Sequence, residues 1–164
     1  MSLQFPVRAC WMRRGSQKRL PSARRPQDTV HFFGAYNWRS SQVSLQAAPA
    51  KNALTFLTFL EQLLRVDYPT QTLVLVLDNA PFHHSHLVQV FLSLFEPRVL
   101  VCWLPPYSPD LNVIERFWKH LKDHVLANKL FLTIPTLVAH VRRLVESQNQ
   151  SHHPLRITFS NYFP

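Results

Sequence analysis

The strongest constraint on the fold of this chain is a run of five apolar residues, Leu73–Leu77, that ends abruptly at Asp78 and Asn79. A run that is apolar on every side predicts a strand buried on both faces of an α/β sheet. A helix that begins at Ser85 and a second apolar strand, Val99–Trp103, come next in the chain. Because a strand, a helix and a strand in this order form a crossover connection, the two strands are predicted to lie parallel.

The remaining elements follow from hydrophobic periodicity and from the prolines that interrupt it. We expect a β-hairpin of Val30–Asn37 and Gln42–Ala47 that turns near Arg39 and Ser40, a helix over Lys51–Arg65, a helix capped by Ser108 with Pro109 in its first turn, and a final helix over Thr133–Ser147. The helix after Ser108 has one apolar face, formed by Leu111, Ile114, Trp118, Leu121 and Val125. The chain is therefore predicted to be of the α/β class.

Charge and composition narrow the kinds of partner. The chain has 164 residues, enough for one domain, and a formal net charge of +9 at pH 7. This charge favours polyanionic partners, because each phosphate neutralised by Lys or Arg releases counterions, although a generally basic soluble protein fits as well. The longest apolar run is too short to span a bilayer, and residues 1–12 lack the features of a signal peptide. The distant Cys10 and Cys102 agree with a reducing compartment, so we expect a cytoplasmic protein.

Two acidic residues occupy positions that suit a metal site. Asp78 follows a predicted parallel strand, where open α/β sheets present their ligands. Glu115 falls early in the helix after the next strand and lies beside its apolar face. Two such oxygen ligands suit Mg²⁺ or Mn²⁺. The spacing leaves two alternatives open: Asp78 and Asn79 form only a turn, and Glu115 forms only an exposed pair with Lys119.

Two long motifs are more specific than this spacing. The segment Leu77-Asp78-Asn79-Ala80-Pro81-Phe82-His83 is followed by Leu104-Pro105-Pro106-Tyr107-Ser108-Pro109-Asp110-Leu111-Asn112-Val113-Ile114-Glu115. Together they closely resemble two signature blocks of the mariner-like superfamily of DDE transposases, especially its bacterial insertion-sequence branch. The segment Trp11-Met12-Arg13-Arg14-Gly15 is similar to the part that follows the family's first strand. The resemblance covers most of residues 5–147.

The resemblance implies an RNase H-like fold, a mixed sheet flanked by helices, and an active site of three acidic residues that binds two Mg²⁺ ions. Asp78 matches the second acidic ligand and Glu115 the third. The first is expected on a strand before Trp11, but no Asp or Glu occurs before Asp28. We therefore expect an N-terminally truncated catalytic domain that lacks its first, central strand, has two unpaired strand edges, and is inactive alone.

Several other residues have predicted roles around this pair. His83 matches a histidine of the family motif, and Asn79, His83 and Asn112 are predicted to support the acidic ligands. Phosphate contacts are predicted for six basic residues, Arg13, Arg14, Lys18, Arg19, Lys119 and Lys122. The first four lie in a predicted extended basic loop, and for Lys119 and Lys122 a solvated basic face is the alternative. We expect Trp103, Phe117 and Trp118 to be core residues rather than base-stacking surfaces, and Cys102 to be buried.

The predicted organisation has three parts: a basic segment over residues 1–28 that follows the missing strand, a partial RNase H-like DDE catalytic domain over residues 29–147, and a C-terminal tail over residues 148–164. The predicted function is that of a truncated transposase catalytic domain, which would act on transposon ends and target DNA in the bacterial cytoplasm, at the nucleoid. One alternative is a non-catalytic fragment that binds DNA or pairs with full-length transposase or another copy of itself. Another is the downstream product of a frameshifted gene.

Overall fold

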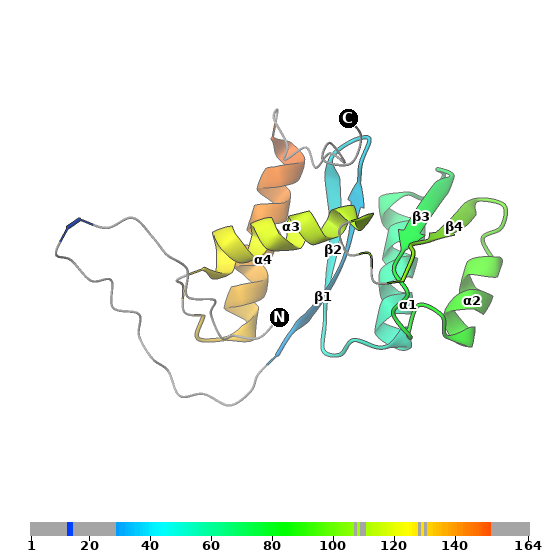
Figure 1. The fold of residues 1–164 in the computed structure, drawn as a ribbon, viewed down its shortest axis with the longest axis horizontal. Coiled ribbons are helices and arrows are strands. Elements are labelled where there is room, and N and C mark those ends of the chain that lie inside the picture. Colours follow the sequence, from blue (N-terminus) through cyan, green and yellow to red (C-terminus); the bar gives the residue numbers. More distant parts are fainter. Residues whose placement is uncertain are drawn as a thin grey trace.

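The computed structural model describes residues 13–14, 29–106, 108, 111–127, 129 and 131–151. The elements follow one another as β1 (His31–Asn37), β2 (Gln42–Ala48), α1 (Ala53–Gln62), η1 (Leu63–Asp67), β3 (Leu73–Leu77), α2 (His86–Ser93), β4 (Val99–Trp103), α3 (Val113–Leu121), η3 (Lys122–Leu126) and α4 (Ile134–Gln150) (Figure 1). The elements η1 and η3 are single π-helical turns that continue α1 and α3.

The predicted hairpin is confirmed. Strands β1 and β2 pair antiparallel, with Asn37 opposite Gln42 at the turn. The Asn37 side-chain oxygen accepts hydrogen bonds from the backbone N–H groups of Arg39 and Ser40, and Ser41 takes a positive φ of 58°. A side chain that accepts hydrogen bonds from the backbone N–H groups two and three residues later in the sequence commonly stabilises such a turn.

The predicted parallel pair is also confirmed, with Leu75 of β3 opposite Val101 of β4. Helix α2 makes the crossover, and the Ser85 side chain caps it by accepting from the Val88 N–H. Helix α1 begins with a capping box, in which Asn52 and Thr55 each accept a hydrogen bond from the other's backbone N–H. These caps place the start of each helix where the sequence predicted it.

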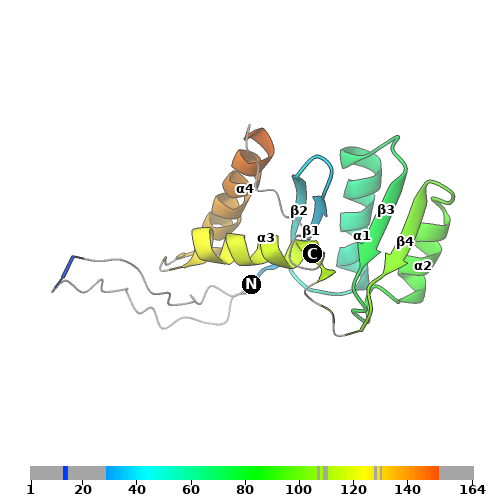
Figure 2. The ribbon, with the colours of Figure 1, turned by 45° about the horizontal axis from the view of Figure 1, so that its top comes forward.

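The hairpin separates two hydrophobic cores, because alternate residues of its strands point to opposite faces. Val30 and Val43 belong to the core that α3, η3 and α4 cover. Phe33 and Ala48 belong to the second core, which α1, α2, β3 and β4 complete. Figure 2 shows the hairpin between α3 and α4 on one side and α1 on the other. Helix α1 thus packs against both two-stranded sheets.

The start of α3 differs from the prediction. We expected Ser108 to cap this helix, but Asn112 is its N-cap and Val113 its first residue. Ser108 instead lies before the helix, and its carbonyl accepts a hydrogen bond from the Leu111 N–H. Asn112 has extended backbone angles, and the helix starts directly after it. Glu115 lies in the first turn of this helix.

The prediction that strand Leu73–Leu77 is buried on both faces was wrong. On the face away from α1 and α2, Val74 is 63% exposed, Val76 51% and Leu100 56%. Cys102, predicted to be buried, is exposed on the same face. The reason is that α3 and α4 pack on the hairpin core and leave this face of the second sheet uncovered.

One edge of β3 has no strand beside it within the described part of the chain, where β3 pairs with β4 alone. Backbone groups of alternate residues in a strand point to opposite edges. The Leu73 N–H and the Leu77 carbonyl form hydrogen bonds on the β4 side. Val74 and Val76 therefore present their N–H and carbonyl groups to the other edge, which is available for pairing.

At the C-terminal end, α4 continues to Gln150 instead of ending near Ser147. The Asn149 side chain accepts from the Val43 N–H at 2.8 Å and donates to the Val43 carbonyl at 3.0 Å. These bonds join the end of the helix to the outer edge of β2. The predicted tail beyond Ser151 and most of the basic segment over residues 1–28 lie outside the described residues. No helix in the described ranges is long and apolar enough to cross a membrane.

Candidate metal and DNA site

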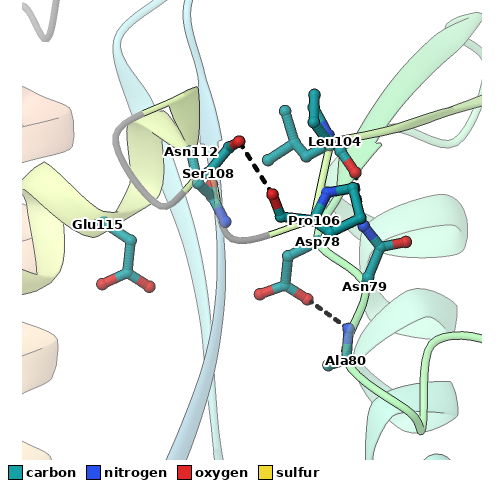
Figure 3. Close-up of a pocket in the computed structure, with 9 residues that line it drawn as sticks. Asp78, Asn79, Ala80, Leu104, Pro106, Ser108, Asn112 and Glu115 are labelled. Atoms are coloured by element: carbon teal, nitrogen blue, oxygen red, sulfur yellow. Dashed lines mark hydrogen bonds between the residues drawn. The ribbon is translucent and has the colours of Figure 1, made fainter.

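The Asp78 carboxylate is held at the end of β3 by two hydrogen bonds to the same oxygen. Its Oδ1 accepts from the Ala80 backbone N–H at 3.1 Å and lies 2.9 Å from His83 Nδ1. The side chain is half-exposed. Among the described residues no partner is recorded for Oδ2, so one carboxylate oxygen is held and the other is available to a ligand (Figure 3).

His83 is the buried polar group that supports this carboxylate. Its ring lies 4.3 Å from the ring centroids of both Phe56 and Phe82. Burial lowers the pKa of His83 below the usual histidine value, although Asp78 opposes that shift. Nδ1 also lies 3.0 Å from the Asp78 carbonyl oxygen, which can only accept, so Nδ1 carries the hydrogen. His83 therefore orients Asp78 as a hydrogen-bond donor.

Glu115 approaches from the other side, on the first turn of α3. Its backbone N–H donates to the Asn112 carbonyl at 3.0 Å. An Asn cap followed by Glu three residues later commonly forms a reciprocal capping box. Here the Asn112 side chain makes no capping bond, and within the described residues the Glu115 carboxylate has no recorded partner, Lys119 included. The polar side chains of Asn112 and Glu115 are thus free for a ligand.

Asp78 and Glu115 line one cavity of about 430 Å³. Figure 3 shows their carboxylates on opposite sides of this space, one from the end of β3 and one from α3. The other lining residues are Asn79, Ala80, Leu104, Pro105, Pro106, Ser108 and Asn112. Leu104, Pro105 and Pro106 line the cavity after the end of β4, and Asn112 and Glu115 line it at the start of α3.

The donors in this cavity fit a hard divalent cation. Carboxylate and amide oxygens are the protein ligands that Mg²⁺ and Mn²⁺ prefer, and Mg²⁺ is commonly bound by one or two carboxylates with several open positions. Asp78 and Glu115 offer unengaged oxygens of this kind. Among the residues that the structure describes, no third His, Cys, Asp or Glu joins them in a group able to hold a metal.

The predicted basic residues lie outside the cavity lining. Lys119 and Lys122 are exposed on α3 and η3, and Arg13 and Arg14 are exposed in the short described stretch near the N-terminus. Lys18 and Arg19 fall outside the described residues. The geometry therefore leaves phosphate binding by these side chains as a prediction.

Two residues near the site were not predicted from the sequence. Lys51 precedes α1, and its Nζ lies 5.3 Å from the Phe82 ring centroid, close enough to His83 to lower its pKa slightly. Trp103, predicted to be a core residue, is 38% exposed at the end of β4. Its position as the last residue of an apolar strand is the signal that could have indicated this, since strand ends border the ligand crevice. Phe117 is buried, as predicted.

Comparison with known sequences gives one family and a consistent set of relatives. A family model described as DDE superfamily endonuclease matches residues 1–138. The uncharacterized 39 kDa protein of insertion element IS630 from Shigella sonnei is 28% identical over 141 residues, which cover 86% of this chain and 40% of that protein. An uncharacterized protein of Sinorhizobium fredii is 33% identical over 67 residues, or 41% of this chain and 46% of that protein. The chain spans less than half the length of each relative.

Solved structures with the same fold include two kinds of enzyme core. The Mos1 transposase in its paired-end complex with the left transposon end has a TM-score of 0.65 and 18% identity, with 94% of this chain and 46% of that one covered. The catalytic core domain of BIV integrase has a TM-score of 0.57 and 22% identity, with 76% of this chain and 78% of that one covered. The predicted RNase H-like fold is thereby confirmed.

Proposed function

Because the chain belongs to the DDE superfamily endonuclease family, we propose that Asp78 and Glu115 are two metal ligands of a site that cleaves and joins DNA strands in transposition. The observation that carries this proposal is the shared cavity, which the two carboxylates enter from separate elements. Residues at the end of β3 and in the first turn of α3 converge there, although the chain between them forms a whole helix and strand.

The proposed ion is Mg²⁺ or Mn²⁺, held by Asp78 and Glu115. When bound, such ions activate an attacking oxygen and stabilise the leaving oxygen of a phosphodiester. The chain's own residues prepare this site. His83 and the Ala80 N–H hold Asp78 Oδ1, which directs Oδ2 to the cavity, while Asn112 provides a side-chain amide beside Glu115.

We further propose that a third carboxylate is supplied by an extended segment that pairs with the free edge of β3. A strand at that edge would end beside Asp78, where its last side chain could reach the same cavity. The proposal rests on the open backbone groups of Val74 and Val76 and on the absence of a third acidic ligand among the described residues. The 164-residue chain alone is accordingly expected not to cleave DNA.

The proposed partners are transposon ends and target DNA, bound through phosphate contacts of Arg13, Arg14, Lys119 and Lys122, with Lys18 and Arg19 as further candidates. The net charge of +9 supports this. The neighbouring Mos1 structure is a paired-end complex with transposon DNA, which supports assembly of this chain with another copy or with a complete transposase. A chain that binds DNA or pairs with transposase without cleaving it is the second candidate, which the free edge of β3 favours.

A plasmid-nicking experiment tests the catalytic proposal. The full chain is compared with a version extended at its N-terminus by a designed strand that alternates apolar residues and ends in Asp. With Mn²⁺, nicking of supercoiled DNA is expected only from the extended version. It should be lost in Asp78→Ala and in Glu115→Ala but kept in Glu146→Ala, an exposed acid on α4.

Two outcomes would contradict the proposal. Nicking by the extended Asp78→Ala variant at the level of its parent would place the chemistry elsewhere. Nicking by the unextended chain that Asp78→Ala abolishes would show that no further carboxylate is needed. DNA binding without nicking in every version would favour the second, non-catalytic candidate.

A further inference from the structure

Two exposed aromatic rings lie stacked beside the cavity. The indole of Trp103 and the imidazole of His84 have centroids 4.0 Å apart and planes tilted by 22°. Trp103 is the last residue of β4, and His84 is exposed in the loop between β3 and α2. Burying these ring faces against solvent would be favourable, so a stacked pair that stays open to water invites a planar ligand.

Hydrogen bonds through Asn79 hold the stack in place. His84 Nε2 donates to Asn79 Oδ1 at 3.0 Å. The Asn79 amide in turn donates to the carbonyl of Leu104, which directly follows Trp103. This chain ties the loop after β3 to the end of β4, so both rings are fixed before any ligand arrives. A preorganised surface loses little conformational entropy on binding.

The same two bridging residues connect the stack to the candidate metal site. Asn79 and Leu104 both line the cavity that Asp78 and Glu115 share. Figure 3 shows Asn79 and Leu104 on the side of the cavity opposite Glu115. A nucleotide bound at the cavity would therefore have the His84–Trp103 pair within reach of its base or that of a neighbour.

We propose that His84 and Trp103 form a stacking platform for an unpaired base of the DNA strand bound at the Asp78–Glu115 site. This inference rests on the proposed function. Every base has a π-face, whereas bases in a duplex have both faces occupied by their neighbours. The platform would therefore select a frayed, extruded or single-stranded nucleotide. Because stacking on a base neutralises no phosphate, the contribution of the platform should not depend on salt as phosphate contacts do.

A competing explanation is that the stack only braces the ends of β3 and β4. Trp38 offers a matched control, since it is a second exposed tryptophan, 68% exposed, in the turn of the β1–β2 hairpin. It lies beside Arg39 and does not line the cavity. If exposed tryptophans contacted DNA in general, replacing either one would weaken DNA binding. The platform predicts that only the replacement of Trp103 does so.

The test measures binding of the full chain to a labelled single-stranded 12-mer and to the matching duplex, in EDTA, by fluorescence anisotropy. Trp103→Ala is expected to weaken single-strand binding about tenfold, as loss of one stacked base contact would. Trp103→Phe should keep most of the affinity, and Trp38→Ala should match the wild type. Duplex affinity and its dependence on salt should be unchanged by all three substitutions.

A second readout reports the base directly. A 12-mer that carries 2-aminopurine at each position in turn should show quenching on binding at one position, which Trp103→Ala and His84→Ala relieve. Thermal unfolding of each variant separates a folding defect from a binding defect, and Trp103→Phe keeps the test valid if Trp103→Ala unfolds.

The platform is overturned by equal loss of duplex and single-strand affinity in Trp103→Ala, by equal effects of Trp38→Ala and Trp103→Ala, or by failure of the wild-type chain to bind the single strand. Since EDTA removes the metal, these results are independent of the ion. Failure of Mn²⁺ binding at Asp78 and Glu115, measured separately, would count against the proposed function and leave the stacking result standing.

Discussion

The indole of Trp118 lies so close to Gly34 that a Cβ atom on residue 34 would come within 2.8 Å of the ring carbons Cη2 and Cζ2. Real side chains do not approach that closely, so only glycine allows α3 to lie at this height above β1. Trp118 follows Glu115 by about one helical turn. The contact between Gly34 and Trp118 therefore sets how far the start of α3, and Glu115 with it, stands from the β1–β2 hairpin.

Substitution Gly34→Ala should push Trp118 and the start of α3 away from the hairpin. Overpacking of this kind typically lowers the free energy of unfolding by about 1–3 kcal/mol, which urea denaturation would measure. Mn²⁺ affinity should fall as well, because Glu115 moves. In a Trp118→Phe background the smaller ring leaves room, so Gly34→Ala should cost less there. Equal costs in both backgrounds would mean that the contact does not set the helix position.

The side chain of Asn149 acts like a short strand at the outer edge of β2. It occupies both the N–H and the carbonyl of Val43. Asn149→Ala removes both bonds and should lower the free energy of unfolding by about 1–3 kcal/mol. Gln150→Ala, an exposed change on the next residue, should stay within about 0.5 kcal/mol of the wild type. A similar loss in both variants would indicate a general effect at the helix end.

Arg98, directly before β4, contacts both η1 and the segment that follows η1. Its guanidinium donates to the carbonyl oxygens of Leu64, at 2.6 Å, and of Pro69, and it lies over the Phe95 ring. A lysine ammonium cannot reproduce this planar, forked contact. Arg98→Lys should therefore cost about 1.5–3 kcal/mol of unfolding free energy. Arg65→Lys keeps an exposed pair with Glu61 and should be nearly neutral, so comparable losses would contradict the role of Arg98.

His120 on α3 should make the fold less stable in mild acid. Burial lowers the pKa of His120, and the adjacent His124 lowers it further against the opposing effect of Asp123. The unfolded chain then binds more protons between the folded and the ordinary pKa values. The contribution of His120 to the free energy of unfolding is therefore fully present above the ordinary histidine pKa. It declines as pH falls from that value toward the pKa of His120 in the folded protein.

Urea midpoints at about pH 7.5 and about pH 5.5 check this sign. The wild type should lose more stability between them than His120→Gln does. His86→Gln, a change at an exposed histidine next to the Ser85 cap, should follow the wild type. If His120→Gln and the wild type decline equally, the pair formed by His120 on α3 and His124 on η3 does not contribute to acid sensitivity.

The local elements could be predicted from the sequence because their signals are local. The alternation in β2, the cap residues Asn52 and Ser85, and the apolar runs of β3 and β4 each determine structure within a few residues. The position of Asp78 at a strand end followed from the same signals. The pairing of Asp78 with Glu115 needed the motif resemblance, since spacing alone allowed a turn and an exposed ion pair.

The mistaken predictions concerned long-range packing. An all-apolar strand such as β3 predicts burial on both faces, but whether a helix covers each face depends on where α3 and α4 pack. Trp103 was assigned to the core for the same reason, and its exposure follows from its place at the open end of β4. The later start of α3 reflects the extended backbone of Asn112, and the signal for it in the sequence is an Asn followed three residues later by Glu115, which the prediction passed over in favour of Ser108 and Pro109.

Asp78 and Glu115 are proposed to hold one and the same divalent ion, and a double-mutant cycle on Mn²⁺ affinity tests this most directly. Electron paramagnetic resonance of free Mn²⁺ would give the affinity of the full chain, of Asp78→Ala, of Glu115→Ala and of the double variant, with Glu146→Ala as the control. Each single substitution should weaken binding at least about tenfold, and the double variant should be weakened by much less than the product of the two effects. Independent, multiplying effects, or binding that neither substitution changes, would contradict a shared metal site.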